Sequence, residues 1–303
     1  MAAWTLFDTV RRLQLTANAI NFGATGDLLK VMLCTAAYAP IPTTDQFKID
    51  VRPAVNEVTG GNYTAGGVTL ASKTATVTAH TFTFDCADLI WLQHAAGFTT
   101  ARIAVCYKDT GVDATSPLIA YADLGSTQNN VVANLPLGTP AGIFSVPAAP
   151  GGWSSWQLYD AFLLRQFTGT PVDFPNETTL KLALLTSAYT VDLTAHAFFS
   201  DVQAAEVSGV NYVAGGVVLA QLGVTVSGHV ARFGVSPRGD ATNPRWAVDP
   251  GGFTNAINAV LYKSTGVAAT SPLIAYCSLN SVAVGNVTGG DMGLNFPAGI
   301  VQL

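Results

Sequence analysis

Charged residues are scarce in this chain. Only 11% of its 303 residues are Asp, Glu, Lys or Arg, whereas soluble domains usually carry about 25%. A surface with so little charge must consist largely of small and neutral side chains such as Thr, Ser, Asn and Gly. The chain therefore either lies in a crowded assembly or presents such neutral side chains to water.

Basic clusters and long apolar runs are also missing. The formal net charge is -5, and basic residues adjoin only at Arg11 and Arg12. Phosphate contacts need a concentrated basic surface, so nucleic-acid binding is disfavoured. No run reaches the roughly 18 apolar residues of a membrane-spanning helix, and residues 1–21 lack the pattern of a secretory signal. We expect a soluble protein that is made in a cytoplasm and does not associate with a membrane.

No two cysteines have the CxxC spacing of a zinc or dithiol site. The internal repeat described next places an aliphatic residue opposite three of the four. Such positions suit a small buried side chain. We therefore expect reduced, buried cysteines without chemistry at Cys34, Cys86, Cys106 and Cys277.

The chain contains an internal repeat. Residues 104–124 and 259–279 are identical at sixteen of twenty-one positions, and residues 57–70 and 206–219 at ten of fourteen. Two such blocks in the same order indicate a tandem repeat. Weaker matches extend the alignment, including WTLFD from Trp4 with WQLYD from Trp156.

The repeat divides the chain into two predicted domains, residues 1–148 and 149–303. Residues 146–152, with the sequence VPAAPGG, have the proline and glycine content of a linker. We place the domain boundary within this segment.

Short runs rich in Val, Thr, Ile, Tyr and Phe predict β-strands in both copies. Residues 28–35 and 179–186 suit central strands, and the apolar–polar alternation of residues 68–84 and 217–233 is typical of antiparallel sheet. The predicted fold class is mainly β: two tandem antiparallel β-sandwich domains, each with a short N-terminal helix.

The N-terminal helix of each copy is predicted from apolar residues three and four positions apart. The favoured interpretation is that each helix closes one end of its own sandwich. The alternative is that its aromatic residues dock against a partner, because aromatic anchors favour interfaces. The candidate interface residues of these segments are Trp4, Phe7, Trp156 and Tyr159.

The histidines do not predict a metal or catalytic site. Only His80 and His229 align between the copies, and neither has a second ligand at metal-binding spacing. Asp192 and His196 lack the GxSxG motif of a hydrolase. We expect edge or surface histidines, no metal and no cofactor.

Other recurring polar residues have structural explanations. Glu57 and Glu206 directly precede a glycine turn and are expected to orient it, while Lys108 and Lys263 are expected to guard sheet edges. The glycine pairs that begin at Gly66 and Gly215 predict a turn or bulge rather than a phosphate loop, because no lysine follows. No catalytic constellation is present, and we expect that the protein is not an enzyme.

Taken together, the motifs LxTxAY, EVxGxxYxAGGVxL, TARIAVCYKDTGxxATSPLIAYADLG and AGI resemble a family of structural proteins of tailed bacteriophages. Members of that family are usually about one copy long and often begin with a similar WxLF helix. The second copy departs from the pattern: Ile257 and Ser278 replace Arg102 and Asp123, and six extra residues lie within residues 236–246. Arg102 and Asp123 are therefore candidate interface residues of the first copy only.

The resemblance implies membership of a virion. Our leading hypothesis is a capsid decoration or cement protein that stabilises the particle by binding other virion proteins, with a homo-oligomer expected there. The alternative in the same class is a neck, tail or head-fibre protein. A carbohydrate-binding, receptor-binding module is the alternative of another class, although the five tryptophans form no evident platform.

Overall fold

The protein is described by a computed structural model that covers residues 3–51, 56–139, 142–147, 156–219, 223–234, 244–279, 285–286, 291–294 and 301–303. We call residues 3–147 the first half and residues 156–303 the second half. The predicted boundary at 148/149 and most of the predicted linker lie outside the described residues.

Each half contains a five-stranded antiparallel sheet, and the strand order is the same in both. The first sheet has the order β1 (Trp4–Leu6), β8 (Leu118–Gln128), β7 (Ala101–Lys108), β2 (Leu29–Cys34) and β3 (Val68–Thr69). The second has the order β11 (Trp156–Leu158), β18 (Leu273–Ser278), β17 (Asn258–Lys263), β12 (Leu180–Leu185) and β13 (Val217–Val218). The predicted mainly β, antiparallel fold is confirmed.

A smaller three-stranded sheet accompanies each large one. The first comprises β10 (Phe144–Pro147), β5 (Thr81–Asp85) and β4 (Thr74–Thr78), and the second β20 (Val301–Gln302), β15 (Val230–Phe233) and β14 (Val224–Ser227). Two-stranded ribbons complete the halves: β6 (Leu89–Trp91) with β9 (Leu135–Leu137), and β16 (Arg245–Trp246) with β19 (Met292–Gly293).

The described helices are short. The α-helices are α1 (Asp8–Leu13), α2 (Lys48–Val51) and α3 (Asp160–Thr168). The 3₁₀ turns are η1 (Asp113–Thr115), η2 (Phe199–Asp201), η3 (Gln203–Ala205) and η4 (Ala268–Thr270).

Trp4 and Trp156 lie in strands, not in the predicted N-terminal helices. Trp4 pairs with Ala122 of β8, and Trp156 pairs with Cys277 of β18. The helices begin four residues later, at Asp8 and Asp160. The helical spacing of the aromatic residues was misleading because WTL and WQL also alternate inward and outward, as strands do.

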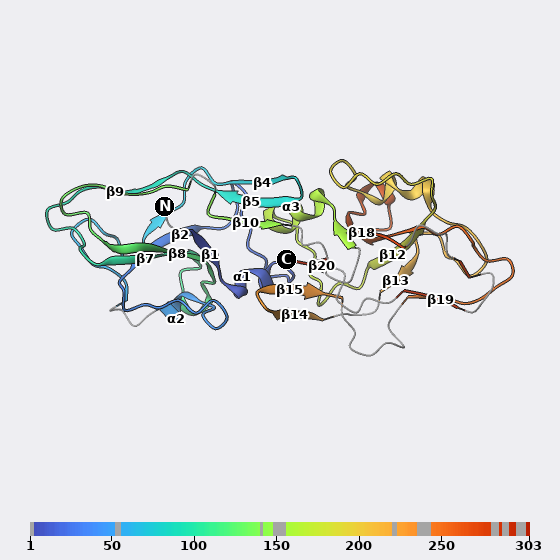
Figure 1. Ribbon diagram of the computed structural model, residues 1–303, viewed down its shortest axis with the longest axis horizontal. Coiled ribbons are helices and arrows are strands. Elements are labelled where there is room, and N and C mark those ends of the chain that lie inside the picture. Colours follow the sequence, from blue (N-terminus) through green and yellow to red (C-terminus); the bar gives the residue numbers. More distant parts are fainter. Residues whose placement is uncertain are drawn as a thin grey trace.

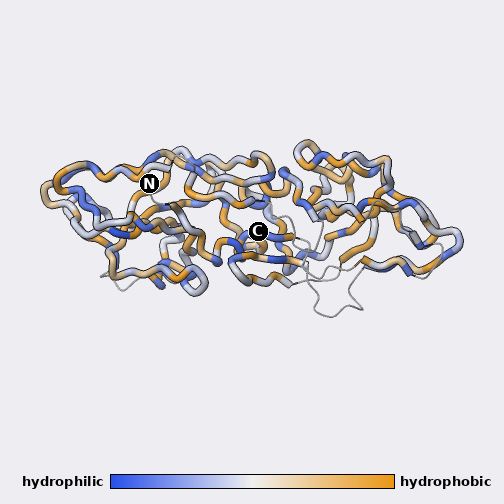
Figure 2. The backbone as a smooth tube through the Cα atoms, in the orientation of Figure 1, coloured by the Kyte–Doolittle hydropathy of each residue, from blue (hydrophilic) through white to orange (hydrophobic). Residues whose placement is uncertain are grey.

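The strand pattern follows from side-chain alternation. In β5, Phe82 and Phe84 are fully buried while the intervening threonine is partly exposed. The β4–β5 hairpin turns through Ala79 and His80, both with positive φ, as two-residue hairpins of this twist require. Hydrophobic and hydrophilic stretches alternate in short lengths along the described chain (Figure 2).

The molecule is elongated, with the two large sheets toward opposite ends and both small sheets near the centre (Figure 1). One cluster of buried apolar residues includes side chains of both halves. The centre of the molecule is therefore built jointly by segments that are far apart in the sequence.

Candidate functional site

The most distinctive feature of the molecule is the central junction, which we define as α1, α3 and the hairpins β4–β5 and β14–β15. Helix α1 of the first half packs against β14 and β15 of the second, while α3 of the second half packs against β4 and β5 of the first (Figure 1). Each helix also contacts a strand of its own half, β8 or β18. Each helix therefore packs on its own half, as expected, and also on a hairpin of the other half, which was not expected.

Aromatic packing explains the docking of α3. The ring of Phe167 stacks on that of Phe82, with centroids 4.1 Å apart and an interplanar angle of 18°. Phe22 packs against both rings, and its backbone N–H donates to the carbonyl of Phe167 over 2.8 Å. In the reciprocal contact, the N–H of Phe174 donates to the carbonyl of Leu15 over 3.2 Å. The two halves are thus joined by backbone hydrogen bonds as well as by apolar contacts.

Two buried glutamines meet at the junction. Gln14 and Gln166 are 0% and 1% exposed. The Gln14 Nε2 donates to the carbonyls of Gln166 and Ile20, both at 3.1 Å, while its Oε1 accepts from the Ile20 N–H. Gln166 repeats the arrangement, donating to the carbonyls of Gln14 and Val172 and accepting from the Val172 N–H. Each side chain satisfies groups of its own half and reaches into the other.

A pair of His–Asp contacts flanks the glutamines. The Nδ1 of His80, in the β4–β5 turn, lies 2.8 Å from the Oδ1 of Asp160 at the start of α3. His229, in the β14–β15 turn, lies at the same distance from Asp8 at the start of α1. Both carboxylates are largely buried, with 9% and 13% side-chain exposure, whereas the histidines are about half exposed. The aligned histidines are therefore partly exposed residues with a polar partner, as expected, and that partner lies in the other half.

The backbone hydrogen bonds, the glutamine contacts and the His–Asp pairs are reciprocal. An interface in which residue i of one unit contacts residue j of the other, and j contacts i, is the arrangement of an approximate two-fold axis. Sequence reasoning missed Gln14 and Gln166. The available signal was a glutamine that recurs at the aligned position of the two segments RLQLT and LRQFT.

Three of the predicted interface residues are buried inside the chain. Phe7 and Tyr159 are 0% exposed and Trp156 is 4% exposed. The Tyr159 hydroxyl shares a 2.8 Å hydrogen bond with that of Tyr189, and burial raises the pKa of Tyr159. These side chains cannot anchor a separate partner. Trp4 is partly buried against the core.

The two remaining predicted interface residues, Arg102 and Asp123, form an exposed ion pair. The Arg102 Nε lies 2.6 Å from the Asp123 Oδ1, and its Nη1 donates to the Gly125 carbonyl over 2.7 Å. The hydrogen bond from Arg102 lowers the pKa of Asp123. The two side chains are 31% and 48% exposed, so both are accessible on the surface of the first half. An exposed pair of this kind contributes little to folding.

The recurring lysines do not guard sheet edges as expected. Lys108 and Lys263 end β7 and β17, which are interior strands. Lys108 pairs with Asp27 at 2.9 Å and Lys263 with Glu177 at 2.7 Å. The error arose because a strand end and a sheet edge cannot be distinguished from one strand's sequence.

The recurring glutamates do orient the glycine turns. The Glu57 Oε1 accepts hydrogen bonds from the Tyr63 hydroxyl at 2.9 Å and the Gly66 N–H at 2.5 Å. Glu206 accepts the equivalent bonds from Tyr212 and Gly215. The prediction of a structural role at these positions is confirmed.

The other singled-out residues are not assembled into a catalytic arrangement. Asp192 accepts hydrogen bonds from the Thr194 and Ala195 N–H groups, while His196 contacts the Tyr189 hydroxyl at 3.0 Å. All four cysteines are buried thiols, as expected. Within the described ranges, no group of three His, Cys, Asp or Glu residues could hold a metal ion. No helix in that part of the chain is long and apolar enough to cross a membrane.

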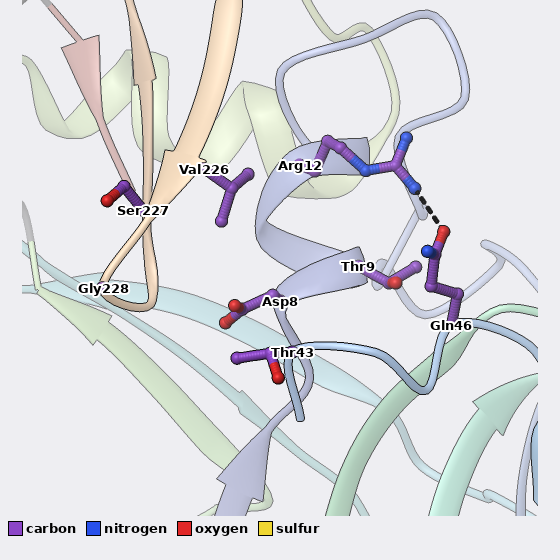
Figure 3. A pocket seen from close by; sticks show the side chains of 8 residues that line it. All are labelled: Asp8, Thr9, Arg12, Thr43, Gln46, Val226, Ser227 and Gly228. Carbon is purple, nitrogen blue, oxygen red and sulfur yellow. Dashed lines mark hydrogen bonds between the residues drawn. The ribbon is translucent and has the colours of Figure 1, made fainter. Parts of the chain in front are cut away.

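A small cleft opens at one side of the junction, where α1 lies between the β14–β15 turn and the loop that carries Gln46 (Figure 3). Its volume is about 250 Å³. Arg12 donates to the Gln46 Oε1 over 3.1 Å. The lining offers hydrogen-bonding groups without a nucleophile–base pair, so its chemistry suits polar contacts. The residues that line the cleft are Asp8, Thr9, Arg12, Thr43, Gln46, Val226, Ser227 and Gly228.

The described residues give the equivalent surface at α3 a different chemistry. The residue of α3 that aligns with Arg12 is Leu164, which is 39% exposed. The approximate two-fold therefore relates a polar surface at α1 to an apolar one at α3. The two faces of the junction present different chemistry to their surroundings.

Comparison of the chain with protein-family models, with curated proteins and with solved structures finds no match.

Proposed function

We propose that this protein is a structural component of a tailed-bacteriophage virion, specifically a capsid decoration or cement protein. The observation that carries the proposal is the reciprocal junction, which joins two like halves into one elongated body with a continuous core. Such a body presents two related sets of surfaces to its neighbours. The motifs that resemble phage structural proteins support the same class.

The surface suits extensive protein contacts. Charged side chains are few, and interface cores are depleted in charge relative to the rest of a protein surface. Several large apolar side chains are well exposed, and those above 55% are Leu92, Val112, Val132, Val213, Val218 and Val267. A decoration protein would bury such groups across the joints between capsomers.

The proposed mechanism is stabilisation by selective binding. A protein that binds the assembled shell but not its separated subunits adds its binding free energy to the shell alone. Bound copies should therefore raise the temperature at which heads disassemble, by an amount that depends on the concentration of free protein. No covalent chemistry is required.

Copy number and position in purified particles test the proposal. Quantitative mass spectrometry should find on the order of hundreds of copies, and antibody labelling in electron microscopy should mark the head. About six to eighteen copies, or label on the neck or tail, would replace decoration with the neck, tail or head-fibre alternative. Absence from particles would refute virion membership.

Glycan binding is the alternative of another class. Flat exposed aromatic rings would be expected of a sugar platform, but Trp91, Trp156 and Trp246 are buried and Trp4 is partly buried. A glycan array with the purified chain tests this alternative directly. Specific binding of one glycan class there would favour it over decoration.

A further inference from the structure

Among the described sheets, two edge strands lack the usual protection against pairing with another chain. Edge strands are commonly short, or carry Pro, charged residues or a bulge. In the four sheets with three or more strands, six of the eight edges follow this rule: β1, β3, β11, β13 and β20 have two or three residues, and β10 contains Pro147. The two exceptions are β4 and β14.

Strands β4 and β14 are longer and uncharged. They have five and four residues, with the sequences TATVT and VTVS. Neither contains Pro, Gly, Lys or an acidic residue, and both pair with their neighbours β5 and β15 without a register shift. Their outward threonines, Thr76 and Thr225, are exposed. Helices α3 and α1 contact β4 and β14, but among the described residues no backbone group outside the two hairpins is hydrogen-bonded to either strand.

The two edges are placed so that one can meet the other on a second copy. Strands β4 and β14 lie along opposite long borders of the molecule (Figure 1). An approximate two-fold rotation relates them, and such a rotation reverses the direction of a strand that lies across its axis. If a second copy is translated across the long axis of the first without rotation, its β14 comes to lie beside β4 of the first copy. The two strands then run antiparallel.

We propose that copies of this chain associate head to tail, with β4 of one copy pairing antiparallel with β14 of the next. The pairing joins two three-stranded sheets into one six-stranded sheet. It leaves the opposite edge of each copy available for another. The contact is heterologous, so repeated pairing builds a row or a closed ring of copies.

The charged residues of the two hairpins lie one strand away from these edges. The neighbouring strand β5 carries Asp85 opposite Thr74, whereas β15 carries Arg232 opposite Thr225. In a joined sheet these charges lie about three strand spacings apart, roughly 14 Å. That distance exceeds the Debye length of about 8 Å, so salt screens these charges, and the backbone pairing supplies the contact.

This inference goes beyond the proposed function, because it concerns the purified chain and does not depend on binding to a particle. Strands of four or five residues are short. We therefore expect weak association, with a Kd of about 0.1–1 mM. The second copy is also the partner that a multicopy virion protein meets most often at high local concentration.

The test is sedimentation velocity of the full-length chain at up to about 1 mM, for the wild type and for Thr76→Lys and Thr225→Lys. A lysine on an exposed edge position blocks pairing without removing a core contact. The wild type should form a series of oligomers, and each variant alone should remain a monomer. Thr100→Lys, which adds the same charge at an exposed loop position, should associate like the wild type.

Mixing the two variants distinguishes head-to-tail pairing from other contacts. Thr76→Lys retains an intact β14, and Thr225→Lys retains an intact β4, so an equal mixture should form dimers and nothing larger. Recovery of dimers also shows that both variants are folded. The proposal is overturned if the wild type stays monomeric, if either variant alone associates like the wild type, if the mixture stays monomeric, or if Thr100→Lys abolishes association.

Discussion

At one aligned position, the two halves cover the ring of a tyrosine with different side chains. Lys48 lies over the ring of Tyr107, with its Nζ 5.0 Å from the centroid, and pairs with Asp113 at 3.0 Å. In the second half, Phe199 stacks on Tyr262 at 4.2 Å with an interplanar angle of 9°. A cation over a ring and a stacked ring both cover the tyrosine face. The local fold therefore tolerates a change of charge at this position.

The buried glutamines should be sensitive to loss of hydrogen bonding. Gln14→Met keeps the size of the side chain but leaves both the N–H and the carbonyl of Ile20 without their Gln14 partner. We expect a loss of about 2–4 kcal/mol in the free energy of unfolding, measured by urea denaturation.

The matched control for this variant is Gln157→Met, at an exposed position of β11. It should change stability by no more than about 0.5 kcal/mol. Equal effects of the two substitutions would show that the junction does not depend on the Gln14 contacts.

Buried thiol and phenol groups predict a loss of stability at alkaline pH. Burial raises the pKa of Cys86 to about 11 from an ordinary value of 9.0, and that of Tyr262 to about 12 from 10.0. The folded chain therefore binds these protons more tightly than the unfolded chain. Their contribution to stability is complete below about pH 9 and is lost as pH rises through the folded-state pKa values.

The urea midpoint should consequently fall between about pH 9 and pH 12. Cys86→Ala should weaken the part of this dependence that begins near the ordinary thiol pKa. Under native conditions near pH 8, alkylation of all four buried cysteines should be much slower than in denaturant. A midpoint that is constant or rising over this range, or rapid labelling of the native chain, would contradict the burial of these groups.

At the scale of elements, the repeat and the strand alternation were readable from the sequence, whereas the exact element types at the N-termini were not. The alternation of residues 68–84 became β4 and β5, and the apolar run of residues 28–35 became β2. The segment WTLFD matched a helical spacing, yet Trp4–Leu6 is a strand. Three residues contain too little pattern to separate the two periods, so pairing with β8 decided the outcome.

The glycine turn before β3 should tolerate no side chain at its second position. Gly67 has φ +79, and a Cβ there would lie 2.0 Å from the backbone oxygen of Val31. Because that oxygen belongs to the central strand β2, it cannot move aside cheaply. We expect Gly67→Ala to cost roughly 3–5 kcal/mol in the free energy of unfolding.

Gly111→Ala provides the control, because Gly111 has a similar φ of +82 and nothing within 4 Å of the added Cβ. It should lower the free energy of unfolding by only about 1–2 kcal/mol, the cost of a residue with a Cβ at positive φ. Thermal or urea unfolding of both variants gives the comparison. If Gly67→Ala is no worse than Gly111→Ala, the close approach of this turn to β2 is incorrect.

At the scale of the whole molecule, the cross-half docking could not be predicted from local patterns. A helix with an apolar face has the same sequence whether it packs on its own hairpin or on the equivalent hairpin of the other half. Which hairpin the helix packs on depends on the path of the chain around the junction. Neither the periodicity of apolar residues nor the repeat alignment predicts that path. The same ambiguity made Phe7 and Tyr159 resemble anchors for a separate partner, although the chain buries both itself.

The junction has a consequence for stability. Helices α1 and α3 each pack on a hairpin of the other half, and Gln14 and Gln166 form hydrogen bonds across the junction. Loss of structure in one half therefore removes packing and hydrogen-bond partners from the other. Halves coupled in this way should unfold together rather than independently.

Differential scanning calorimetry of the intact chain tests this central claim most directly. We predict one endothermic transition whose calorimetric enthalpy equals the van't Hoff enthalpy, with Gln14→Met lowering the temperature of that single transition. Two resolved transitions, with Gln14→Met shifting only the one that belongs to the first half, would show that the halves are independent and would contradict the account.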